Sequence, residues 1–370
     1  MKIQPFKLER YFAKYEFTTP YLLSCSDCEP LTIKELLSIA SPDMLKAWEN
    51  LTLAYTDSQG HPLLREEISK LYTKITEDDI LVLTPEEGIF IAMNILLEEG
   101  DHVITTFPGY QSLYEIAESN KCKVSKWLPD EDMNFKLEDL FKQIRDNTKL
   151  IVLNFPHNPT GATITEIDLI KIIQIARQKN IVVFSDEMYR FLEYDQQDRL
   201  PSVSEIYENG ISLFGLSKTF ALPGLRIGWL ASGNKEIMAE IGSFKDYTTI
   251  CSSAPSEILS IIALQNKESI ITRNLELIKS NLEFADTILK NHADTLIWKK
   301  PKAGTIAFPE LQIEQDVYKF CLDLIKKKGV MLLPSSVYDY DRKCVRIGFG
   351  RKNFPEVISI FEEYLYELSR

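Results

Sequence analysis

The sequence has no uninterrupted run of about 18 apolar residues, so we expect no membrane-spanning helix. Its opening, MKIQPFKLERYFAKYEF, mixes charged and aromatic residues and lacks the apolar core of a signal peptide. No stretch interleaves dense lysine and arginine with aromatic residues, so nucleic acid is not an expected partner. The 42 lysines and arginines are outnumbered by 54 aspartates and glutamates, which gives a net charge of −12. These features favour an enzyme that acts on small molecules.

Disulfide and metal-binding patterns are also missing. The six cysteines are scattered, and the Cys25-x-x-Cys28 pair has no second such pair and no histidine pair to accompany it. The four histidines stand at unrelated spacings, so we expect no metal site. Scattered cysteines in a chain of this length are typical of reduced thiols, and we expect a cytoplasmic location.

Short runs rich in β-branched residues alternate with helix-period segments from about residue 80 to residue 235. Strands are expected at 102–106, 150–154, 181–185, 211–215 and 227–232. Apolar strands that alternate with helices predict a parallel sheet covered on both faces. Beyond it, residues 256–292 are predicted to be one long helical stretch broken near Lys267, and mixed strand and helix signals follow.

We therefore predict an α/β fold with a large domain, whose mostly parallel sheet lies between helices, and a smaller α+β domain. A chain of 370 residues is long enough for two such domains. The large domain is expected to span residues 43–263. The small domain is expected to combine residues 1–42 with residues 264–370.

Ligands of open parallel sheets bind at the carboxyl ends of the strands, so the residues after each strand form the candidate site. They offer an aromatic ring, an amide, a carboxylate with a phenol, and an amine. In chain order these groups belong to Tyr110, Asn154 with Asn158, Asp186 with Tyr189, and Lys218. Because the strand ends share one edge of the sheet, we expect a single site.

Lys218 lies in the largely apolar stretch FGLSKTFALPGLRIGWL. Apolar surroundings and the nearby Arg226 would both lower the pKa of Lys218 and make its amine a better nucleophile toward a carbonyl. A P-loop needs glycine where Ser217 stands, no Gly-x-Gly-x-x-Gly follows a strand, and a Gly-x-Ser-x-Gly elbow fails at Thr219. An amine, a strand-end carboxylate and an aromatic ring together suit pyridoxal 5′-phosphate (PLP).

Four segments resemble motifs of the class I/II aminotransferases of fold type I. SLFGLSKTFALPGLRIGW resembles their cofactor-lysine motif, NFPHNPTG their Asn-Pro-Thr-Gly loop, FSDEMY their Asp-x-x-Tyr, and VRIGFG their substrate-carboxylate arginine segment. The order and approximate spacing agree across about residues 50–350. The resemblance implies a PLP-dependent transferase that moves the amino group of an α-amino acid to a 2-oxo acid.

The resemblance also implies a role for each matching residue at the cofactor ring. Lys218 would form a Schiff base with the cofactor and later shuttle a proton. Asp186 would pair with the protonated ring nitrogen. Asn158 and Tyr189 would hydrogen-bond the phenolic oxygen, with Asn158 also facing the substrate, and Tyr110 would stack on the ring.

The remaining roles concern the phosphate and the substrate. Arg226 would bind the phosphate, with Ser217 and the N–H of Glu86 as further ligands, and Arg346 would bind the substrate carboxylate in a bidentate fork. Tyr55, in AYTDSQGHPLLREEI, resembles the tyrosine that reaches the phosphate of the neighbouring subunit. The chain would then be a homodimer with shared active sites.

Two departures from the family concern the phosphate site. Where the family presents small residues at the start of a helix, this chain has Thr84-Pro85-Glu86, and Pro85 has no N–H to donate. A carboxylate at Glu86 is unfavourable beside phosphate unless it points away, whereas the N–H groups of Glu86 and Thr84 and the helix N-terminus still attract an anion. The family often has serine three residues before the lysine, and this chain has Gly215.

Transamination is the reaction we expect. The LERYFAKYEF opening resembles that of capreomycidine-synthase-like members, so a PLP-dependent lyase or cyclase is the alternative. A non-catalytic cofactor-binding protein of the same fold is a second alternative, which the presence of Lys218, Asp186 and Arg346 disfavours. Asp27 and Glu29 in the N-terminal segment would favour a basic substrate side chain over a dicarboxylic substrate.

Overall fold

The computed structural model of the chain describes residues 2–368. Its helices are α1 (Lys7–Tyr15), α2 (Ile33–Ser38), α3 (Pro42–Glu49), α4 (Pro62–Ser69), α5 (Pro85–Leu96), α6 (Ser112–Ser119), α7 (Leu137–Phe141), α8 (Glu166–Gln178), α9 (Val203–Ile206), α10 (Lys235–Lys245), α11 (Ala254–Gln265), α12 (Lys267–Lys290), α13 (Val317–Lys328) and α14 (Phe354–Leu368). The short 3₁₀ helices are η1 (Glu77–Asp79), η2 (Gln196–Asp198), η3 (Pro223–Leu225) and η4 (Ser335–Tyr338).

The strands are β1 (Tyr21–Leu22), β2 (Ile80–Leu83), β3 (His102–Thr106), β4 (Lys123–Trp127), β5 (Thr148–Asn154), β6 (Val182–Asp186), β7 (Gly210–Gly215), β8 (Gly228–Ala231), β9 (Leu296–Ile297), β10 (Ile306–Ala307), β11 (Glu310–Leu311), β12 (Val330–Met331), β13 (Leu333–Pro334) and β14 (Val345–Gly348). Within residues 2–368, seven of them form the main sheet in the order β2-β8-β7-β6-β5-β3-β4. The pairs from β7 to β4 are parallel, whereas β8 is antiparallel to β2 and β7. The predicted α/β fold with a mostly parallel sheet is confirmed.

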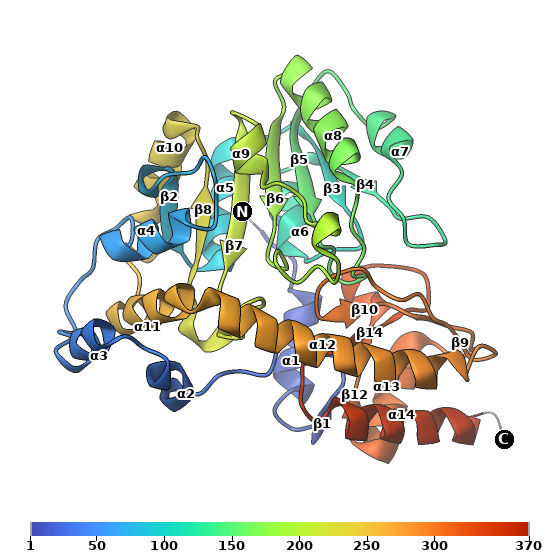
Figure 1. Ribbon diagram of the computed structural model, residues 1–370. Helices are drawn as coiled ribbons and strands as arrows, with labels where there is room; N and C mark the ends of the chain where they lie inside the picture. Colours follow the sequence, from blue (N-terminus) through green and yellow to red (C-terminus); the bar gives the residue numbers. More distant parts are fainter. Residues whose placement is uncertain (1, 369–370) are drawn as a thin grey trace.

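Helices cover both faces of this sheet because successive strand residues point to opposite sides. Phe184 packs into a cluster with residues of α5, α6 and α10, whereas its neighbour Val183 packs with residues of α7, α8 and α9. A further cluster joins β2, β7 and β8 to α4 and α11. The sheet is therefore the middle layer of the larger part of the molecule, in the upper half of Figure 1.

The five predicted strands are all present, and one of them differs in direction. The prediction placed 227–232 in the parallel set, but β8 runs antiparallel. The chain from Leu216 to Ile227 contains only the 3₁₀ helix η3, and a parallel crossover needs a longer connection that is usually helical. All four β8 residues are buried, so the strand has the same apolar pattern as its parallel neighbours.

The predicted long helical stretch is also present. Asn266 separates α11 from α12, which confirms the predicted break near Lys267. Figure 1 shows α12 running from beneath the sheet toward the C-terminal part of the chain. None of the helices within residues 2–368 has the length and apolar character needed to cross a membrane.

The N-terminal residues contact both parts of the molecule. β1 pairs with β12, and α1 packs with Met331, Leu333 and Tyr338 of the C-terminal part. By contrast, α2 and α3 contact α11 beneath the sheet. The domain limits at residues 42 and 263 stay a prediction.

Residues 23–29, which we call the N-terminal strap, lie against β14 with no space between the two backbones. The N–H of Gly348 donates to the carbonyl oxygen of Leu23 at 2.7 Å, and the N–H of Glu29 donates to that of Gly350 at 2.7 Å. A Cβ atom on Gly348 would lie 1.8 Å from the carbonyl oxygen of Cys25, and one on Gly350 would lie 2.1 Å from that of Asp27. The two glycines of VRIGFG therefore allow the strap to pass.

We predict that Gly348→Ala destabilises the chain by about 2 kcal/mol or more, because the added methyl group must displace the strap backbone. Gly242→Ala, in α10, is the control, since a Cβ there meets nothing within 4 Å. Urea unfolding followed by tryptophan fluorescence measures both variants. Equal urea midpoints for the two variants would show that the close approach of the strap to Gly348 does not contribute to stability.

Candidate active site

The carboxyl ends of β3, β5, β6 and β7 meet at one cavity of about 390 Å³. Tyr110 follows β3, Asn154 ends β5, Asp186 ends β6 and Lys218 follows β7, as the parallel arrangement requires. Ten of the residues predicted for the site line this cavity, namely Asp27, Glu86, Tyr110, Asn158, Asp186, Tyr189, Ser217, Lys218, Arg226 and Arg346.

Two predicted residues lie elsewhere. Tyr55 is 89% exposed and does not line the cavity. Glu29 is also outside it, and its carboxylate accepts a hydrogen bond from the backbone N–H of Lys352 at 3.0 Å. Asp27 lines the cavity, but its two carboxylate oxygens bind Arg351 at 2.9 and 3.0 Å.

The amine of Lys218 is buried and has one hydrogen-bond partner, the hydroxyl of Ser26, at 2.8 Å. Burial lowers the pKa of Lys218, and the charge of Arg346 lowers it further, while Asp27 acts in the opposite direction. The apolar surroundings predicted from the sequence therefore act as expected. The cation beside the amine, however, is Arg346 from the C-terminal part rather than the predicted Arg226.

Asp186 lies at the base of the cavity. Its side chain accepts a hydrogen bond from the N–H of Met188 at 3.1 Å, and its carbonyl oxygen accepts one from the amide of Asn154 at 3.1 Å. Burial raises the pKa of Asp186 to about 7. A cationic group placed against this carboxyl would favour its ionised form and lower that pKa again.

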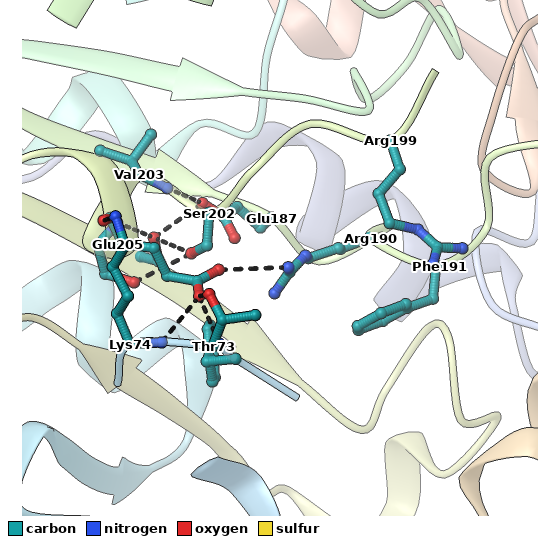
Figure 2. A network of polar contacts seen from close by, with 12 residues as sticks. Thr73, Lys74, Glu187, Arg190, Phe191, Arg199, Ser202, Val203 and Glu205 are labelled. Atoms are coloured by element: carbon teal, nitrogen blue, oxygen red, sulfur yellow. Dashed lines mark hydrogen bonds and ion pairs between the residues drawn. The ribbon is translucent and has the colours of Figure 1, made fainter. Parts of the chain in front are cut away.

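A buried polar network anchors the chain directly after Asp186 (Figure 2). The carboxylate of Glu187 accepts hydrogen bonds from the N–H of Val203 at 3.0 Å and the hydroxyl of Ser212 at 2.8 Å. Arg190 lies 3.6 Å from Glu205, and both side chains are almost fully buried. The network thus ties the loop that follows Asp186 and carries Tyr189 to β7 and α9.

Arg346 is 1% exposed and forms the second polar centre of the cavity. Its Nε and Nη2 atoms donate to the carbonyl oxygen of Ser24 at 3.0 and 2.8 Å. Its Nη1 atom donates to the hydroxyl of Tyr338 at 2.8 Å and to the side-chain oxygen of Asn158 at 3.4 Å. These are four contacts from a group with five N–H donors, and the one to Asn158 is long, so Nη1 and Nη2 can still bind a carboxylate in the cavity.

The two predicted tyrosines contact the N-terminal residues. The hydroxyl of Tyr189 donates to the carbonyl oxygen of Ser26 at 3.0 Å. The hydroxyl of Tyr110 donates to Glu9 of α1 at 3.0 Å. Burial raises the pKa of both phenols, so both remain protonated donors at neutral pH.

The two departures from the family at the phosphate site meet in space. The ring of Pro85 packs on Gly215 and Gly228, because a Cβ atom on these glycines would lie 3.2 and 2.6 Å from Pro85 Cγ. The proline at the start of α5 and the missing side chain at 215 are therefore parts of one packing arrangement. Next to it, Arg226 holds a left-handed backbone with φ of 56°, and the Nη1 atom of its exposed side chain donates to the carbonyl oxygen of Pro223 in η3 at 3.0 Å.

Glu86 lines the same end of the cavity. Its carboxylate accepts a hydrogen bond from the hydroxyl of Ser112 at 3.2 Å, and burial raises the pKa of Glu86 to about 7. A neutral carboxylic acid beside a phosphate is tolerated, whereas an ionised one is repelled. The N–H of Thr84 already lies 3.4 Å from Glu87, so it is less free than the sequence suggested.

Among the site residues that were not predicted from the sequence, four carry a carboxyl or hydroxyl group, namely Glu9, Glu16, Ser26 and Tyr338. Glu9 and Glu16 share one face of the N-terminal helical pattern, since residues seven positions apart lie almost above one another. The seven-residue spacing of these two glutamates can be recognised in the sequence alone. Ser26 and Tyr338 belong to no pattern, because their places depend on contacts with distant parts of the chain.

The donor set fits PLP. The cavity brings together an amine with a lowered pKa, a buried carboxyl at its base, an aromatic ring, an arginine near a helix N-terminus and a second arginine for a carboxylate. Lys218, Asp186, Tyr110 and Arg226 would hold the cofactor.

Comparison with known proteins agrees with this arrangement. Residues 40–356 match the family model described as aminotransferase class I and II. The aspartate aminotransferase of Sulfolobus acidocaldarius is 30% identical over 347 residues, which cover 88% of this chain and 86% of that protein. The capreomycidine synthase of Streptomyces vinaceus is 28% identical over 266 residues, which cover 71% of this chain and 68% of that protein.

A crystal structure of a PLP-dependent aminotransferase from Streptococcus suis superposes with a TM-score of 0.93 at 29% identity, with 99% of both chains covered. The family match contains every strand of the main sheet and every strand end that lines the cavity. The chain therefore belongs to the class I and II aminotransferase family.

Proposed function

We propose that this chain is a PLP-dependent aminotransferase that transfers the amino group of an α-amino acid to a 2-oxo acid. The observation that carries the proposal is the meeting of Lys218, Asp186 and Arg346 at one cavity. Family membership and the aminotransferase relatives support the same activity and the same cofactor.

When bound, PLP withdraws electrons from the substrate Cα atom. Lys218 would hold the cofactor through its amine, and its Nζ atom would take the proton from the substrate Cα atom and deliver it to the cofactor. The lowered pKa of Lys218 suits this exchange, because a neutral amine is the form that attacks a carbonyl and accepts a proton. Asp186 would be ionised beside the ring nitrogen of the cofactor and would keep that nitrogen protonated.

Arg346 binds the α-carboxylate of the substrate through the donor capacity that its contacts leave and orients Cα toward Lys218. Tyr338 and Ser24 keep their contacts with the guanidinium and fix its plane. Ser217, Arg226 and the first turn of α5 would bind the phosphate. Tyr110 would cover one face of the cofactor ring, and Tyr189 would donate to its phenolic oxygen.

We further propose a homodimer. Leu53, Tyr55, Tyr247 and Ile250 are exposed by 82%, 89%, 91% and 50%, and we call them the apolar patch. Their two segments adjoin, since Lys245 donates to the carbonyl oxygens of both Ser58 and Ile250. Exposed apolar groups of this size favour a protein partner, and a second copy would bring Tyr55 to the neighbouring site.

We also propose a cytoplasmic location. The six cysteines form no disulfide, which supports it.

A cyclase or lyase reaction is the second candidate, favoured by the similarity to capreomycidine synthase. Both reactions would use the same cofactor residues and differ in the bond that breaks. The products therefore distinguish them.

We predict that purified protein supplied with PLP is yellow, that borohydride fixes the cofactor to Lys218, and that Lys218→Ala lowers turnover by at least about a hundredfold. Lys235→Ala, on the surface, is the control. A panel of amino acids identifies the reaction: a 2-oxo acid product indicates transamination, and ammonia or a cyclic product indicates the alternative. Protein that stays colourless and shows no spectral response to PLP would exclude the proposed function.

We predict that Glu86 makes PLP binding weaker as the pH rises. Above pH 7 its carboxyl ionises and repels the phosphate, while ionisation of Asp186 near the same pH favours binding. Glu86→Gln removes the first effect and leaves the second. The ratio of the wild-type to the variant dissociation constant should therefore rise between pH 7 and 8.5, by up to about tenfold per pH unit. Fluorescence titration with PLP measures it.

The matched control is Glu87→Gln, because Glu87 lies in the same helical turn but does not line the cavity and binds Thr249 at 2.7 Å. A ratio that stays constant with pH for Glu86→Gln would contradict the role of Glu86.

We predict that Leu53→Asp converts a dimer to a monomer in sedimentation velocity, because it places a charge in the apolar patch. Phe17→Asp changes a side chain of similar exposure, 89%, outside the patch and should leave the dimer intact. In the same proteins Tyr55→Phe should keep the dimer and weaken PLP binding severalfold. A monomeric wild-type chain would refute this arrangement.

A further inference from the structure

One face of the N-terminal helix forms a wall of the cavity. Leu8, Glu9 and Phe12 of α1 and Glu16 at its C-terminal end line the cavity together with Lys218 and Arg346. These positions repeat at helical spacing, so a single face of α1 supplies them. The wall places two glutamates where a substrate side chain would extend.

Within the described residues 2–368, the carboxylate of Glu16 has no directly bonded cation. Among residues 2–368, no side chain or backbone group forms a hydrogen bond or ion pair with its carboxylate, although Glu16 is partly buried. Burial raises the pKa of Glu16, and the charges of Asp27 and Glu9 raise it further, whereas the charges of Arg351 and Lys218 act in the opposite direction without forming an ion pair with it. Such a group is stabilised by a cation.

Glu9 likewise forms no ion pair with a side chain of the described residues. Its carboxylate accepts a hydrogen bond from the hydroxyl of Tyr110 at 3.0 Å, and Tyr110 is uncharged. Asp27 differs, because Arg351 binds both of its oxygens. The carboxylates available to a ligand are therefore Glu9 and Glu16, rather than the Asp27 and Glu29 expected from the sequence.

The distances along α1 suit an extended substrate. The guanidinium carbon of Arg346 lies 5.6 Å from the centre of the Phe12 ring. Glu16 follows Phe12 by four residues, about 6 Å along the helix axis. A substrate whose carboxylate binds Arg346 would thus pass its side chain along Phe12 and reach Glu16.

The cations of the cavity have other roles. Those among its lining residues are Lys218, Arg226 and Arg346, which serve the cofactor aldehyde, the phosphate and the substrate α-carboxylate. Among the residues that the structure describes, no lining cation is left for a second substrate carboxylate. A dicarboxylic donor would instead meet Glu9 and Glu16 and be repelled.

We propose that α1 selects an amino donor with a cationic side chain, whose ammonium or guanidinium group pairs with Glu16 and Glu9 while its α-carboxylate binds Arg346. This inference rests on the proposed function, because an amino donor is a substrate of an aminotransferase. Phe12 lies between the two ends and packs against the aliphatic part of the side chain.

The test compares pairs of amino acids of similar shape and different charge. L-arginine is paired with L-citrulline, whose urea group is neutral, and L-lysine with L-norleucine. Calorimetry measures their binding to the PLP-loaded protein, and absorbance measures the rate at which each converts the cofactor to its amine form. We expect the cationic member of each pair to bind at least about tenfold more tightly. L-aspartate and L-glutamate should bind more weakly than L-citrulline.

Two variants test whether the glutamates of α1 cause the preference for a cationic side chain. Glu16→Gln should lower the arginine-to-citrulline affinity ratio at least about fivefold, and Glu9→Gln with Glu16→Gln should bring it close to one. Both variants should bind L-norleucine as the wild type does. Glu49→Gln, at the exposed end of α3, is the control and should change neither ratio.

Equal affinity of the wild type for arginine and citrulline would overturn the inference, as would a ratio that the glutamine variants leave unchanged. The proposed function fails separately, if no amino acid of the panel converts the cofactor. In that case a charge-selective affinity lost in the variants would still support a cation site on α1.

Discussion

The close approach of the N-terminal strap to β14 is the contact on which the site depends. β14 supplies Arg346, which binds the carbonyl oxygen of Ser24, and Gly348, whose missing side chain leaves room for Cys25. In the same strap, Ser26 accepts hydrogen bonds from both Lys218 and Tyr189, which follow strands β7 and β6 of the sheet. The strap thus connects the sheet to the C-terminal part of the chain at the place where the cavity forms. The strap is therefore a partner that β14, which carries Arg346, shares with the segment that carries Lys218.

The balance of charge inside the cavity differs from that of an ordinary anion site. Three cations face five carboxyl groups, those of Glu9, Glu16, Asp27, Glu86 and Asp186. Burial holds the pKa of two of these, Glu86 and Asp186, at about 7, and Arg351 compensates Asp27. The negative potential therefore concentrates on α1, away from the phosphate. The net charge of −12 does not reveal this separation, because it sums the charged residues of the whole chain without regard to their positions.

Most of the fold and the sheet-borne half of the site could be predicted from the sequence. Asp186 and Lys218 stand at the ends of strands with clear apolar patterns, and parallel strands bring their ends together without further information. The direction of β8 could not be read, because a buried strand has the same pattern in either direction. Glu16, Ser26 and Tyr338 reach the cavity through packing of α1, the strap and η4, which local patterns do not encode. The cation beside Lys218 was misassigned for the same reason: Arg226 is near in sequence, whereas Arg346 is near in space.

Pro85 has a consequence for how this phosphate site can change. Its ring occupies the space that side chains at 215 and 228 would need. A Cβ atom at 228 would lie 2.6 Å from the proline ring and 2.7 Å from the carbonyl oxygen of Phe214, so glycine is required there in this structure. At 215 the contacts are less severe, since a Cβ atom would lie 3.0 Å from the Cα atom of Gly228 and 3.2 Å from the proline ring. The three positions are therefore coupled in design: a side chain introduced at 215 or 228 needs room that the ring of Pro85 now fills.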